Sequence, residues 1–465
     1  MQLIRCDLCV IGGGSGGLSV AAGAAQLGAS VVLFEGHRMG GDCLNTGCVP
    51  SKTLLSIAKA AVDGAEPLDQ RYAKAKQRVR DVIASIAPHD SVERFEGLGV
   101  QVIQAPARFV DTKTVVGGDF RIRARRFVIA TGSRPRIPAI SGIEEVEYWT
   151  SDTLFEADQF PASFAVLGAG AIGLEMAQAH HKLGSEVTVI EPFVMMGRDD
   201  PALVSELRET LESSGIRFVM GQAVERISRD ESGLTVVHFA NHEPVIAQRL
   251  LVATGRMPNI EQLDLGAAGI QYDARGISTD ARLRTNHRHI FAIGDVAGRE
   301  AFTHAAGAHA SVVVKQALFG LPAKAAGQVI PWVTYTDPEL AHAGLTQAER
   351  DAQVPIAQQH VMEIAFADID RARCEGRTDG RIRIVTDAKG RVLSADILGQ
   401  HAGELILPWV LAIEQNIPMS KMASTVVPYP TRSEISKRVA GSYFTERLFS
   451  ARTRTLVRWI QKLIP

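Results

Sequence analysis

The 465-residue sequence has few cysteines and no long hydrophobic stretch. No apolar run approaches the ~20 residues that a membrane-spanning helix requires. Residues 1–6 lead into a strand pattern without the charged start and apolar core of a secretory signal. Five cysteines are too few for a disulfide scaffold in a chain of this length. We therefore expect a cytoplasmic protein, in which a close cysteine pair is redox-active or metal-binding.

An excess of charge of one sign is also absent. Lys and Arg number 50 and Asp and Glu number 51, which gives a net charge of −1. This balance gives no indication of a nucleic-acid or acidic partner. Hydrophobic residues make up 46% and charged residues 22%, as in soluble globular proteins. The length corresponds to roughly three domains of ~150 residues.

A strand, a glycine-rich turn, a helix and a second strand follow one another at the start of the chain. The pattern predicts a strand over 3–11, a helix over 18–27 and a strand over 30–34 that ends at Glu35. Glycines in the turn allow a tight bend, a close approach of backbone amides to a pyrophosphate, and packing of the helix on the strand. Glu35 then lies where a carboxylate binds ribose hydroxyls. The predicted cofactor-binding residues are Gly12, Gly14, Gly17 and Glu35.

The same unit occurs a second time, around residues 164–191, which indicates a second dinucleotide site. Its predicted cofactor-binding residues are Gly168, Gly170, Gly173 and Glu191. Glu191 accepts hydrogen bonds from the 2′-hydroxyl of NAD and repels the 2′-phosphate of NADP, so we expect NAD(H) in preference to NADP(H). Arg198 lies seven residues later and weakens that discrimination if it reaches the phosphate. Alternatively, Glu191 is only a solvated strand end.

Two cysteines five residues apart, Cys43 and Cys48, follow the first glycine turn. They have no further Cys or His at short spacing, which argues against a metal site. Pro50 is typical of a first helical turn and places Cys48 at a helix N-terminus, where the dipole stabilises a thiolate. Lys52 lies four residues after Cys48 on the same helix face. The pattern favours a redox-active pair.

These motifs together resemble the class I pyridine nucleotide–disulfide oxidoreductases, which include dihydrolipoamide dehydrogenase, glutathione reductase and mercuric reductase. The resemblance covers nearly the whole chain. The motifs that carry it are the two glycine turns, the Cys-x4-Cys run that ends at residues 49–52, the Ala-Thr-Gly phrases at 130–132 and 253–255, the Ile-Gly-Asp at 293–295, and Tyr429-Pro430-Thr431 with Glu434.

The resemblance implies an α/β fold with two Rossmann-like dinucleotide-binding domains and a C-terminal α+β dimerisation domain. The expected boundaries are 1–145 with 270–330 for a split FAD-binding domain, 146–269 for an NAD(P)-binding domain, and 331–465 for the interface domain. The implied cofactors are FAD and NAD(H). The implied assembly is a homodimer in which each subunit completes the active site of the other.

The resemblance also implies roles for individual residues. Cys48 is the thiol that faces the flavin, and Cys43 exchanges with substrate. Lys52 and Glu175 pair near the reactive nitrogen of the flavin, and Asp295 holds the ribityl chain. The remaining implied cofactor-binding residues are Thr131, Gly132, Gly255, Arg256 and Ala305, the last at the start of a helix aimed at the flavin.

One position departs from the family pattern. The disulfide reductases carry a histidine as general base where this chain has Tyr429, followed by Glu434. A phenol with a pKa near ~10 is a poor base at neutral pH. Mercuric reductases have a tyrosine here, but they also have a C-terminal cysteine pair, which this sequence lacks. The expected catalytic residues are Cys43, Cys48, Lys52, Glu175, Tyr429 and Glu434.

We expect an FAD-dependent NAD(P)H:disulfide oxidoreductase, most similar to dihydrolipoamide dehydrogenase, acting on a small-molecule or protein-borne disulfide or dithiol. One alternative is a mercuric-reductase-like enzyme that reduces a thiol-bound metal ion. Another is an electron-transfer flavoprotein that docks to a membrane partner. Residues 442–465 are basic and amphipathic, and they either contact a membrane surface or pack within the dimer.

Overall fold

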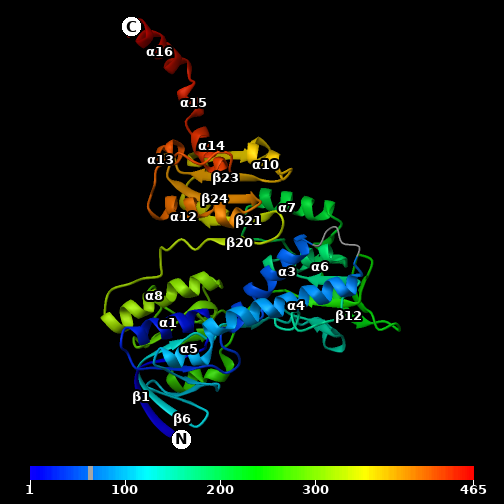
Figure 1. Cartoon of the computed structure of the whole chain (residues 1–465), viewed down its shortest axis with the longest axis vertical. Helices are drawn as coiled ribbons and strands as arrows, with labels where there is room; N and C mark the ends of the chain where they lie inside the picture. The colour runs from blue at the N-terminus through cyan, green and yellow to red at the C-terminus, as the bar shows by residue number, and fades with distance from the viewer. Residues whose placement is uncertain (61–65, 465) are drawn as a thin grey trace. The chain divides into compact units, whose positions relative to one another are not determined.

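The computed structural model describes residues 1–60 and 66–464 (Figure 1). The chain divides into two compact units. The first contains residues 1–194 and 215–328, and the second contains residues 195–214 and 329–465. The three expected domain boundaries stay predictions, because this division is coarser than they are. The inclusion of 195–214 in the second unit was not expected from the sequence.

A seven-stranded sheet begins the first unit, in the order β3-β2-β1-β6-β5-β4 with β19 beside β6. The parallel strands β1 and β6 are apolar and buried toward their carboxyl ends, where hydrophobic clusters cover both faces of the sheet. Ile11 pairs with Phe34 and with Ile129, so the carboxyl ends of these strands meet at one edge. The strands are β1 (Gln2–Ile11), β2 (Val31–Phe34), β3 (Val100–Ile103), β4 (Arg108–Asp111), β5 (Thr114–Gly117), β6 (Phe120–Ile129) and β19 (Ile290–Ala292).

The helices of this part position the first glycine turn and the cysteines. Helix α1 (Ser15–Gln26) follows the turn and packs against α8 (Thr303–Phe319). The cysteine run forms α2 (Gly41–Asn45) and α3 (Cys48–Ala60). Helices α4 (Leu68–Ile86) and α5 (Val92–Gly97) follow, and residues 61–65 lie outside the described residues.

A second sheet in the first unit is wholly parallel and has the order β11-β10-β9-β15-β8. Its strands are β8 (Tyr148–Trp149), β9 (Ser163–Leu167), β10 (Glu186–Glu191), β11 (Arg217–Met220) and β15 (Arg249–Val252), and α6 (Ala171–Leu183) follows the second glycine turn. Smaller antiparallel sheets join β12 (Val224–Arg229), β13 (Thr235–Phe239) and β14 (Val245–Ala247), β7 (Ser133–Pro135) with β16 (Arg256–Pro258), and β17 (Tyr272–Asp273) with β18 (Gly276–Ile277).

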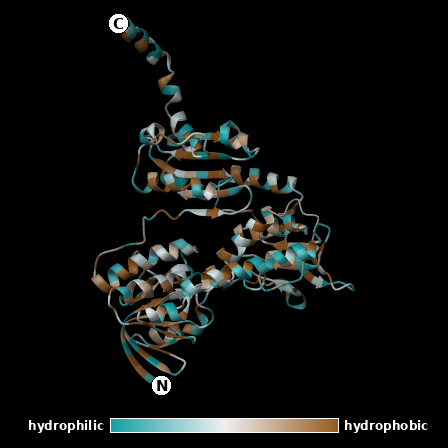
Figure 2. Ribbon diagram, in the orientation of Figure 1, coloured by the Kyte–Doolittle hydropathy of each residue, from teal (hydrophilic) through white to brown (hydrophobic). Residues whose placement is uncertain are grey.

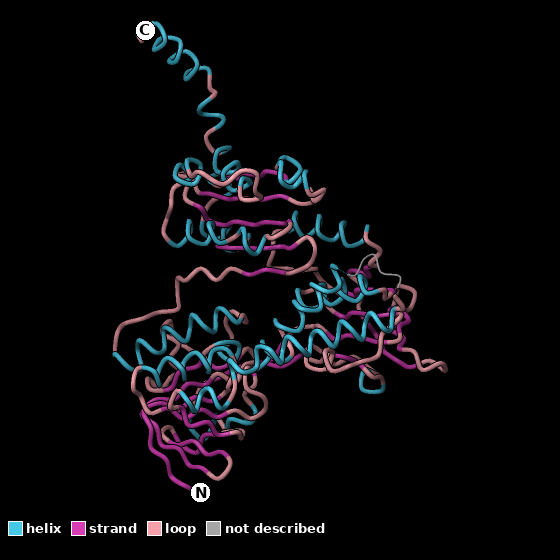
Figure 3. Tube along the Cα trace, viewed as in Figure 1, coloured by secondary structure: helices cyan, strands magenta, loops and turns pink. Residues whose placement is uncertain are grey.

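The second unit is built on a five-stranded antiparallel sheet in the order β20-β21-β24-β23-β22, with helices alongside it (Figure 3). Trp409 is fully buried in its core and donates a hydrogen bond to Ser436 Oγ (3.1 Å), which links α12 to α14. The strands are β20 (Trp332–Thr334), β21 (Glu339–Gly344), β22 (His360–Ala365), β23 (Arg381–Thr386) and β24 (Val392–Gly399). The helices are α7 (Pro201–Ser213), α9 (Gln347–Gln353), α10 (Asp370–Cys374), α11 (Ala402–Leu405), α12 (Leu407–Glu414), α13 (Met419–Ser424), α14 (Glu434–Ser442), α15 (Thr445–Leu448) and α16 (Ala451–Leu463).

One mixed and one parallel sheet, each with a strand that leads into a glycine turn, together with an antiparallel α+β unit, confirm the expected fold class. Within residues 1–60 and 66–464, no helix is long and apolar enough to cross a bilayer.

Candidate active site

The first glycine turn joins β1 to α1 and is closed by Glu35. Gly12 has φ +109°, and a Cβ there would lie 2.3 Å from Ala130 O. A Cβ on Gly17 would lie 1.9 Å from Gly12 O, so helix and strand require glycine to pack this closely. The Glu35 carboxylate accepts hydrogen bonds from the amides of Gly13 (2.6 Å) and His37 (2.6 Å). The strand-end carboxylate is therefore held against the turn.

The second glycine turn repeats this geometry between β9 and α6. Gly168 has φ +111°, and a Cβ on Gly173 would lie 2.0 Å from Gly168 O. The Glu191 carboxylate accepts hydrogen bonds from the amides of Ala169 (2.9 Å) and Phe193 (2.9 Å). Glu191 is therefore an anchored part of the turn and not merely a solvated strand end.

Both turns fit a dinucleotide. The N-caps of α1 and α6 are Gly14 and Gly170, and neither makes a side-chain cap hydrogen bond. A Cβ on Gly170 would meet no atom within 4 Å. A Cβ on Gly14 would meet only Gly41 Cα, at 3.7 Å. The positive N-terminal end and backbone amides of α6 therefore face an open position, and those of α1 face the start of α2, as pyrophosphate binding at a helix N-terminus requires.

The two cysteines lie on consecutive short helices next to the first glycine turn. Gly14 forms an isolated β-bridge with Gly40, which directly precedes α2. Cys43 lies on α2 and is half-buried, whereas Cys48 is the first residue of α3 and is exposed. Both thiols are free. The Cys48 sulfur lies 3.6 Å from the hydroxyl of Thr303, the first residue of α8.

The two thiols have opposite pKa shifts. The hydrogen bond from Cys43, together with Thr303 and the charge of Lys52, lowers the pKa of Cys48 to about 6. Although the residue is exposed, protein atoms around the sulfur displace part of its water, and this desolvation acts in the opposite direction. The pKa of Cys43 is raised by the same hydrogen bond to Cys48 and by burial. At neutral pH the reduced pair therefore holds one proton on Cys43 and a thiolate at Cys48.

Lys52 and Glu175 form an ion pair, Nζ to Oε2, at 2.7 Å. Lys52 follows Cys48 by one turn of α3, and Glu175 lies on α6, which packs against α3. The Glu175 side chain is only 4% exposed, so little solvent screens the pair. The structure thus brings together these two expected site residues, and their role toward the flavin stays a prediction.

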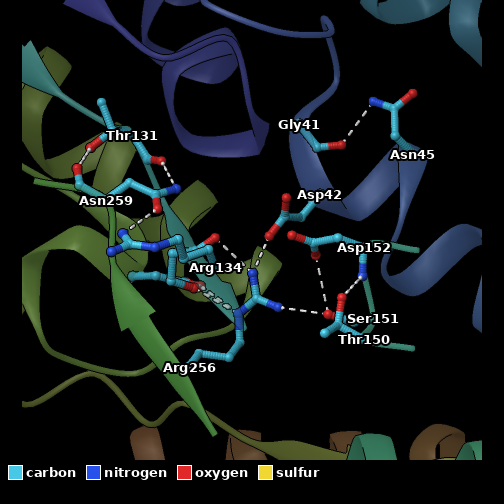
Figure 4. Close-up of polar contacts among 12 residues, drawn as sticks. Gly41, Asp42, Asn45, Thr131, Arg134, Thr150, Ser151, Asp152, Arg256 and Asn259 are labelled. Atoms are coloured by element: carbon cyan, nitrogen blue, oxygen red, sulfur yellow. Dashed lines mark hydrogen bonds and ion pairs between the residues drawn. The ribbon is translucent and has the colours of Figure 1, made fainter. Parts of the chain in front are cut away.

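Arg256 links the second Ala-Thr-Gly turn to the cysteine segment (Figure 4). Its guanidinium donates hydrogen bonds to the hydroxyl (2.7 Å) and carbonyl (2.8 Å) of Ser133 and to Ser151 Oγ (3.2 Å). It also binds the carboxylate of Asp42, the residue before Cys43. Burial raises the pKa of the Asp42 carboxyl, and the charge of Arg256 opposes that effect.

The other expected cofactor residues lie around this network. Asp295 Oδ2 accepts a hydrogen bond from Ser133 Oγ (2.5 Å) and lies 3.9 Å from Arg256 Nε. Thr131 Oγ1 donates to Asn259 O (2.7 Å), and Asn259 Nδ2 returns a bond to Thr131 O (3.0 Å). Gly132 and Gly255 both have positive φ. Ala305 is buried in the first turns of α8.

Tyr429 and Glu434 lie in the second unit. Tyr429 is 69% exposed, and its hydroxyl donates a hydrogen bond to Asp370 Oδ2 (3.2 Å), which raises the phenol pKa further. Glu434 begins α14, and its Oε1 lies 4.0 Å from Arg438. Its Oε2 is buried without a hydrogen-bond partner among the described residues.

Two residues of the site were not identified from the sequence: Thr303, beside Cys48, and Asp42, bound to Arg256. The sequence around Thr303 indicates that it could begin a helix, but no neighbouring residue indicates that it lies next to a thiol. The guanidinium of Arg198, which could have weakened the discrimination by Glu191, lies 4.6 Å from the ring centre of Trp332.

Comparison with known families and proteins gives extensive matches. The family described as pyridine nucleotide-disulphide oxidoreductase matches residues 6–310, and its dimerisation domain matches residues 330–440.

Individual proteins match over at least 92% of this chain and over differing shares of their own length. A mercuric reductase of Bacillus cereus is 33% identical over 92% of this chain and 70% of the relative. A dihydrolipoyl dehydrogenase of Thermus scotoductus is 34% identical over 92% of this chain and 95% of the relative. The structure of the HOCl-induced flavoprotein disulfide reductase RclA from Escherichia coli, in a Cu(II) complex, superimposes with a TM-score of 0.86 at 26% identity, over 94% of this chain and 99% of that one.

Proposed function

The chain belongs to the pyridine nucleotide-disulphide oxidoreductase family, and we propose that it is an NADH-dependent reductase that delivers two electrons to its substrate through Cys43 and Cys48. Family membership implies binding of FAD and a pyridine nucleotide. The observation that carries the proposal is the hydrogen-bonded pair of thiols, in which the pKa of Cys48 is lowered to about 6. A thiolate is the reactive form in thiol–disulfide exchange.

The residues around the first turn would hold FAD. Gly12–Gly17 and Glu35 would bind its pyrophosphate and ribose, and Arg256, Asp295 and Thr131 would lie along it. When bound, FAD supplies the two-electron transfer between nicotinamide and the thiol pair. Lys52, held by Glu175, keeps a positive charge one helical turn from Cys48 and stabilises its thiolate.

The exchange with a disulfide substrate proceeds in two substitutions. Cys43 attacks one substrate sulfur and forms a mixed disulfide, and its proton passes to the other substrate sulfur, which leaves as a thiol. The Cys48 thiolate then attacks Cys43, which closes the Cys43–Cys48 disulfide and releases the second substrate sulfur. The pair is oxidised by two electrons and the substrate reduced by two, and NADH restores the dithiol.

We expect a disulfide or dithiol of the lipoamide type as the first candidate substrate. A thiol-bound metal ion is the second, and Tyr429 favours it. The hydrogen bond to Asp370 raises the phenol pKa, so Tyr429 is a poor acceptor for the Cys43 proton. A soft metal ion binds directly to thiolates and depends less on a separate base.

NADH as the electron donor is also part of the proposal. Glu191 is fixed by two backbone amides at the end of β10, where a 2′-phosphate would meet its charge. The guanidinium of Arg198, which would have to bind that phosphate, is stacked on Trp332. We expect kcat/KM for NADH to exceed that for NADPH.

The functional form we propose is a homodimer, because residues 330–440 match the dimerisation domain of the family. In such a dimer Tyr429 and Glu434 would serve the thiols of the partner subunit. Sedimentation velocity of the full chain tests this, and a monomer at assay concentrations would contradict it.

One set of assays tests the proposal. Steady-state rates are measured with lipoamide, oxidised glutathione and mercuric ion, each with NADH and with NADPH, for the wild type and for Cys43→Ser and Cys48→Ser. Activity with any of the three acceptors that is lost in both variants supports the thiol route, and the preferred acceptor distinguishes the two candidates. Rapid flavin reduction without turnover of any acceptor would contradict it and favour an electron-transfer protein.

A further inference from the structure

Helix α16 (Ala451–Leu463) is amphipathic, and none of its residues is buried. Four of its apolar side chains, Leu456, Trp459, Ile460 and Leu463, follow the spacing of one helix face, and Val457 lies beside that face. The exposed fractions of these four are 59%, 63%, 37% and 80%. Along α16, Figure 2 shows hydrophobic residues in brown interleaved with hydrophilic residues in teal. The apolar face thus has no cover within the described chain.

The polar face of the same helix carries charge of one sign. Arg454, Arg458 and Lys462 lie four residues apart in one row, and α16 contains no Asp or Glu. A fourth cation, Arg452, precedes Leu456 by four residues and Trp459 by seven, so it lies at the N-terminal end of the apolar face. Like charges at this spacing destabilise an isolated helix, and cations in its first turn oppose the helix dipole. The composition is therefore unfavourable for a helix in water and favourable beside a surface of negative charge.

We propose that α16 binds the surface of a membrane that contains anionic lipids, with its axis in the plane of the interface. The four apolar side chains enter the boundary between headgroups and acyl chains, and the row of cations lies against the phosphates. Trp459, whose ring packs against the Lys462 ammonium at 5.6 Å, lies where apolar and basic side chains meet. The inference is independent of the substrate and of the thiol chemistry.

The decisive experiment is flotation of the full-length holoenzyme with vesicles. Vesicles of phosphatidylcholine with phosphatidylglycerol are compared with phosphatidylcholine alone. We expect binding to the anionic vesicles only, and weaker binding at high salt because salt screens the attraction. The variant Arg454→Gln/Arg458→Gln/Lys462→Gln should lose about 100-fold in partition coefficient, since each cation near an anionic surface contributes roughly a fivefold factor.

The matched control is a variant that loses the same three positive charges at sites outside α16. Arg108, Arg275 and Arg391 have exposed side chains in other parts of the chain. The variant Arg108→Gln/Arg275→Gln/Arg391→Gln should bind anionic vesicles like the wild type. Equal partition of the α16 variant and the wild type, or absence of wild-type binding, would overturn the proposal. Both variants should retain the NADH-dependent activity of the wild type, which verifies the fold and separates this test from that of the proposed function.

Tryptophan fluorescence gives a second readout. The protein has four tryptophans, and Trp149, Trp332 and Trp409 are at most 9% exposed. A blue shift on addition of anionic vesicles should therefore report Trp459 and disappear in Trp459→Phe, whereas flotation persists. A shift that is unchanged in Trp459→Phe would contradict the insertion of this face.

The competing occupant is a second copy of the chain. Trp459→Ser/Leu463→Ser should weaken vesicle binding and leave the sedimentation coefficient unchanged. A variant that dissociates the dimer and still binds vesicles normally would assign the apolar face to the subunit interface and refute the membrane proposal.

Discussion

At the scale of single residues, the cysteine pair shows how position alone separates two identical side chains. Cys48 begins α3, one turn before Lys52, and accepts the hydrogen bond of Cys43. Cys43 lies on α2 and holds the shared proton. The division of roles between a thiolate and a proton-bearing thiol therefore depends on the presence of both residues.

The pH dependence of Cys48 alkylation tests this division. In the reduced enzyme, the rate of reaction with iodoacetamide at Cys48 should rise with pH through about 6 and then level off, because the thiolate forms above its pKa. Removal of the hydrogen bond in Cys43→Ala should move the midpoint upward, toward the ordinary thiol value of ~8.5. Peptide mass spectrometry measures the rate of Cys48 alkylation at each pH in the wild type and in Cys43→Ala.

The exposed thiol Cys374 provides the control for that measurement. Its replacement in Cys374→Ser should leave the Cys48 midpoint unchanged. An unshifted midpoint in Cys43→Ala would show that the neighbouring thiol does not set the Cys48 pKa.

Tyr429 occupies the position of the general base that would accept the proton of Cys43 during exchange with substrate. We expect Tyr429→His to raise lipoamide turnover about tenfold or more, because an imidazole with a pKa near ~6.5 can accept the Cys43 proton and a general base typically contributes about 10²–10⁴-fold. Steady-state kcat with lipoamide measures the gain. Adding Glu434→Gln should remove most of it if Glu434 orients the imidazole. The absence of any gain would show that Tyr429 is not positioned to serve the thiols.

At the scale of elements, the two glycine turns are the same device used twice. Each joins a buried parallel strand to a helix, and each is closed by the carboxylate of the next strand, Glu35 or Glu191. In the second turn, Gly173 is required by close packing, whereas Gly170 lies at the open N-terminal end of α6. Substitution of each glycine can therefore test packing and nucleotide binding separately.

Alanine substitutions in the second turn should therefore have different effects. Gly173→Ala places a Cβ 2.0 Å from Gly168 O and should lower the free energy of unfolding by ~1–3 kcal/mol. Gly170→Ala meets no atom within 4 Å. It should leave stability unchanged and weaken NADH binding by about tenfold, or ~1.4 kcal/mol, because the methyl group enters the space next to the helix N-terminus.

Thermal denaturation and the KM for NADH measure the two effects. Gly197→Ala, at another position with no atom within 4 Å, is the control and should change neither. Loss of stability without loss of NADH affinity in Gly170→Ala would contradict the assignment of that position to the nucleotide.

The elements also show where prediction from the sequence succeeds. The strands, both glycine turns and the carboxylates at Glu35 and Glu191 follow from local periodicity, and the structure has them where they were expected. The proximity of Lys52 to Glu175 came only from the resemblance to a family. The contact of Arg256 with Asp42 joins residues 214 positions apart, and that of Cys48 with Thr303 joins residues 255 apart. Local patterns do not specify such contacts, because they depend on how separate elements pack.

At the scale of the whole molecule, the segment 195–214 leaves the first unit directly after β10 and joins the second. Asp200 caps α7 by accepting hydrogen bonds from the amides of Ala202 (3.0 Å) and Leu203 (3.4 Å). Its other carboxylate oxygen lies 3.2 Å from Arg383 Nε on β23. The chain that leaves β10 at Glu191 thus continues into a helix that belongs to the second unit.

From this connection we predict that α7 unfolds cooperatively with the sheet of the second unit. Helix α7 should exchange its amide hydrogens together with β23 and β24, since elements that open together form one cooperative unit. Arg383→Met leaves the Asp200 carboxylate, which is 3% exposed, without this cation, at a cost of up to ~3 kcal/mol. Hydrogen exchange measured by mass spectrometry should then become faster in α7 and stay unchanged in β9 and β10. The control Arg275→Gln, on an exposed loop, should alter neither region. Faster exchange of α7 together with β10 would instead place this helix in one cooperative unit with the sheet of β9 and β10, and would contradict the prediction.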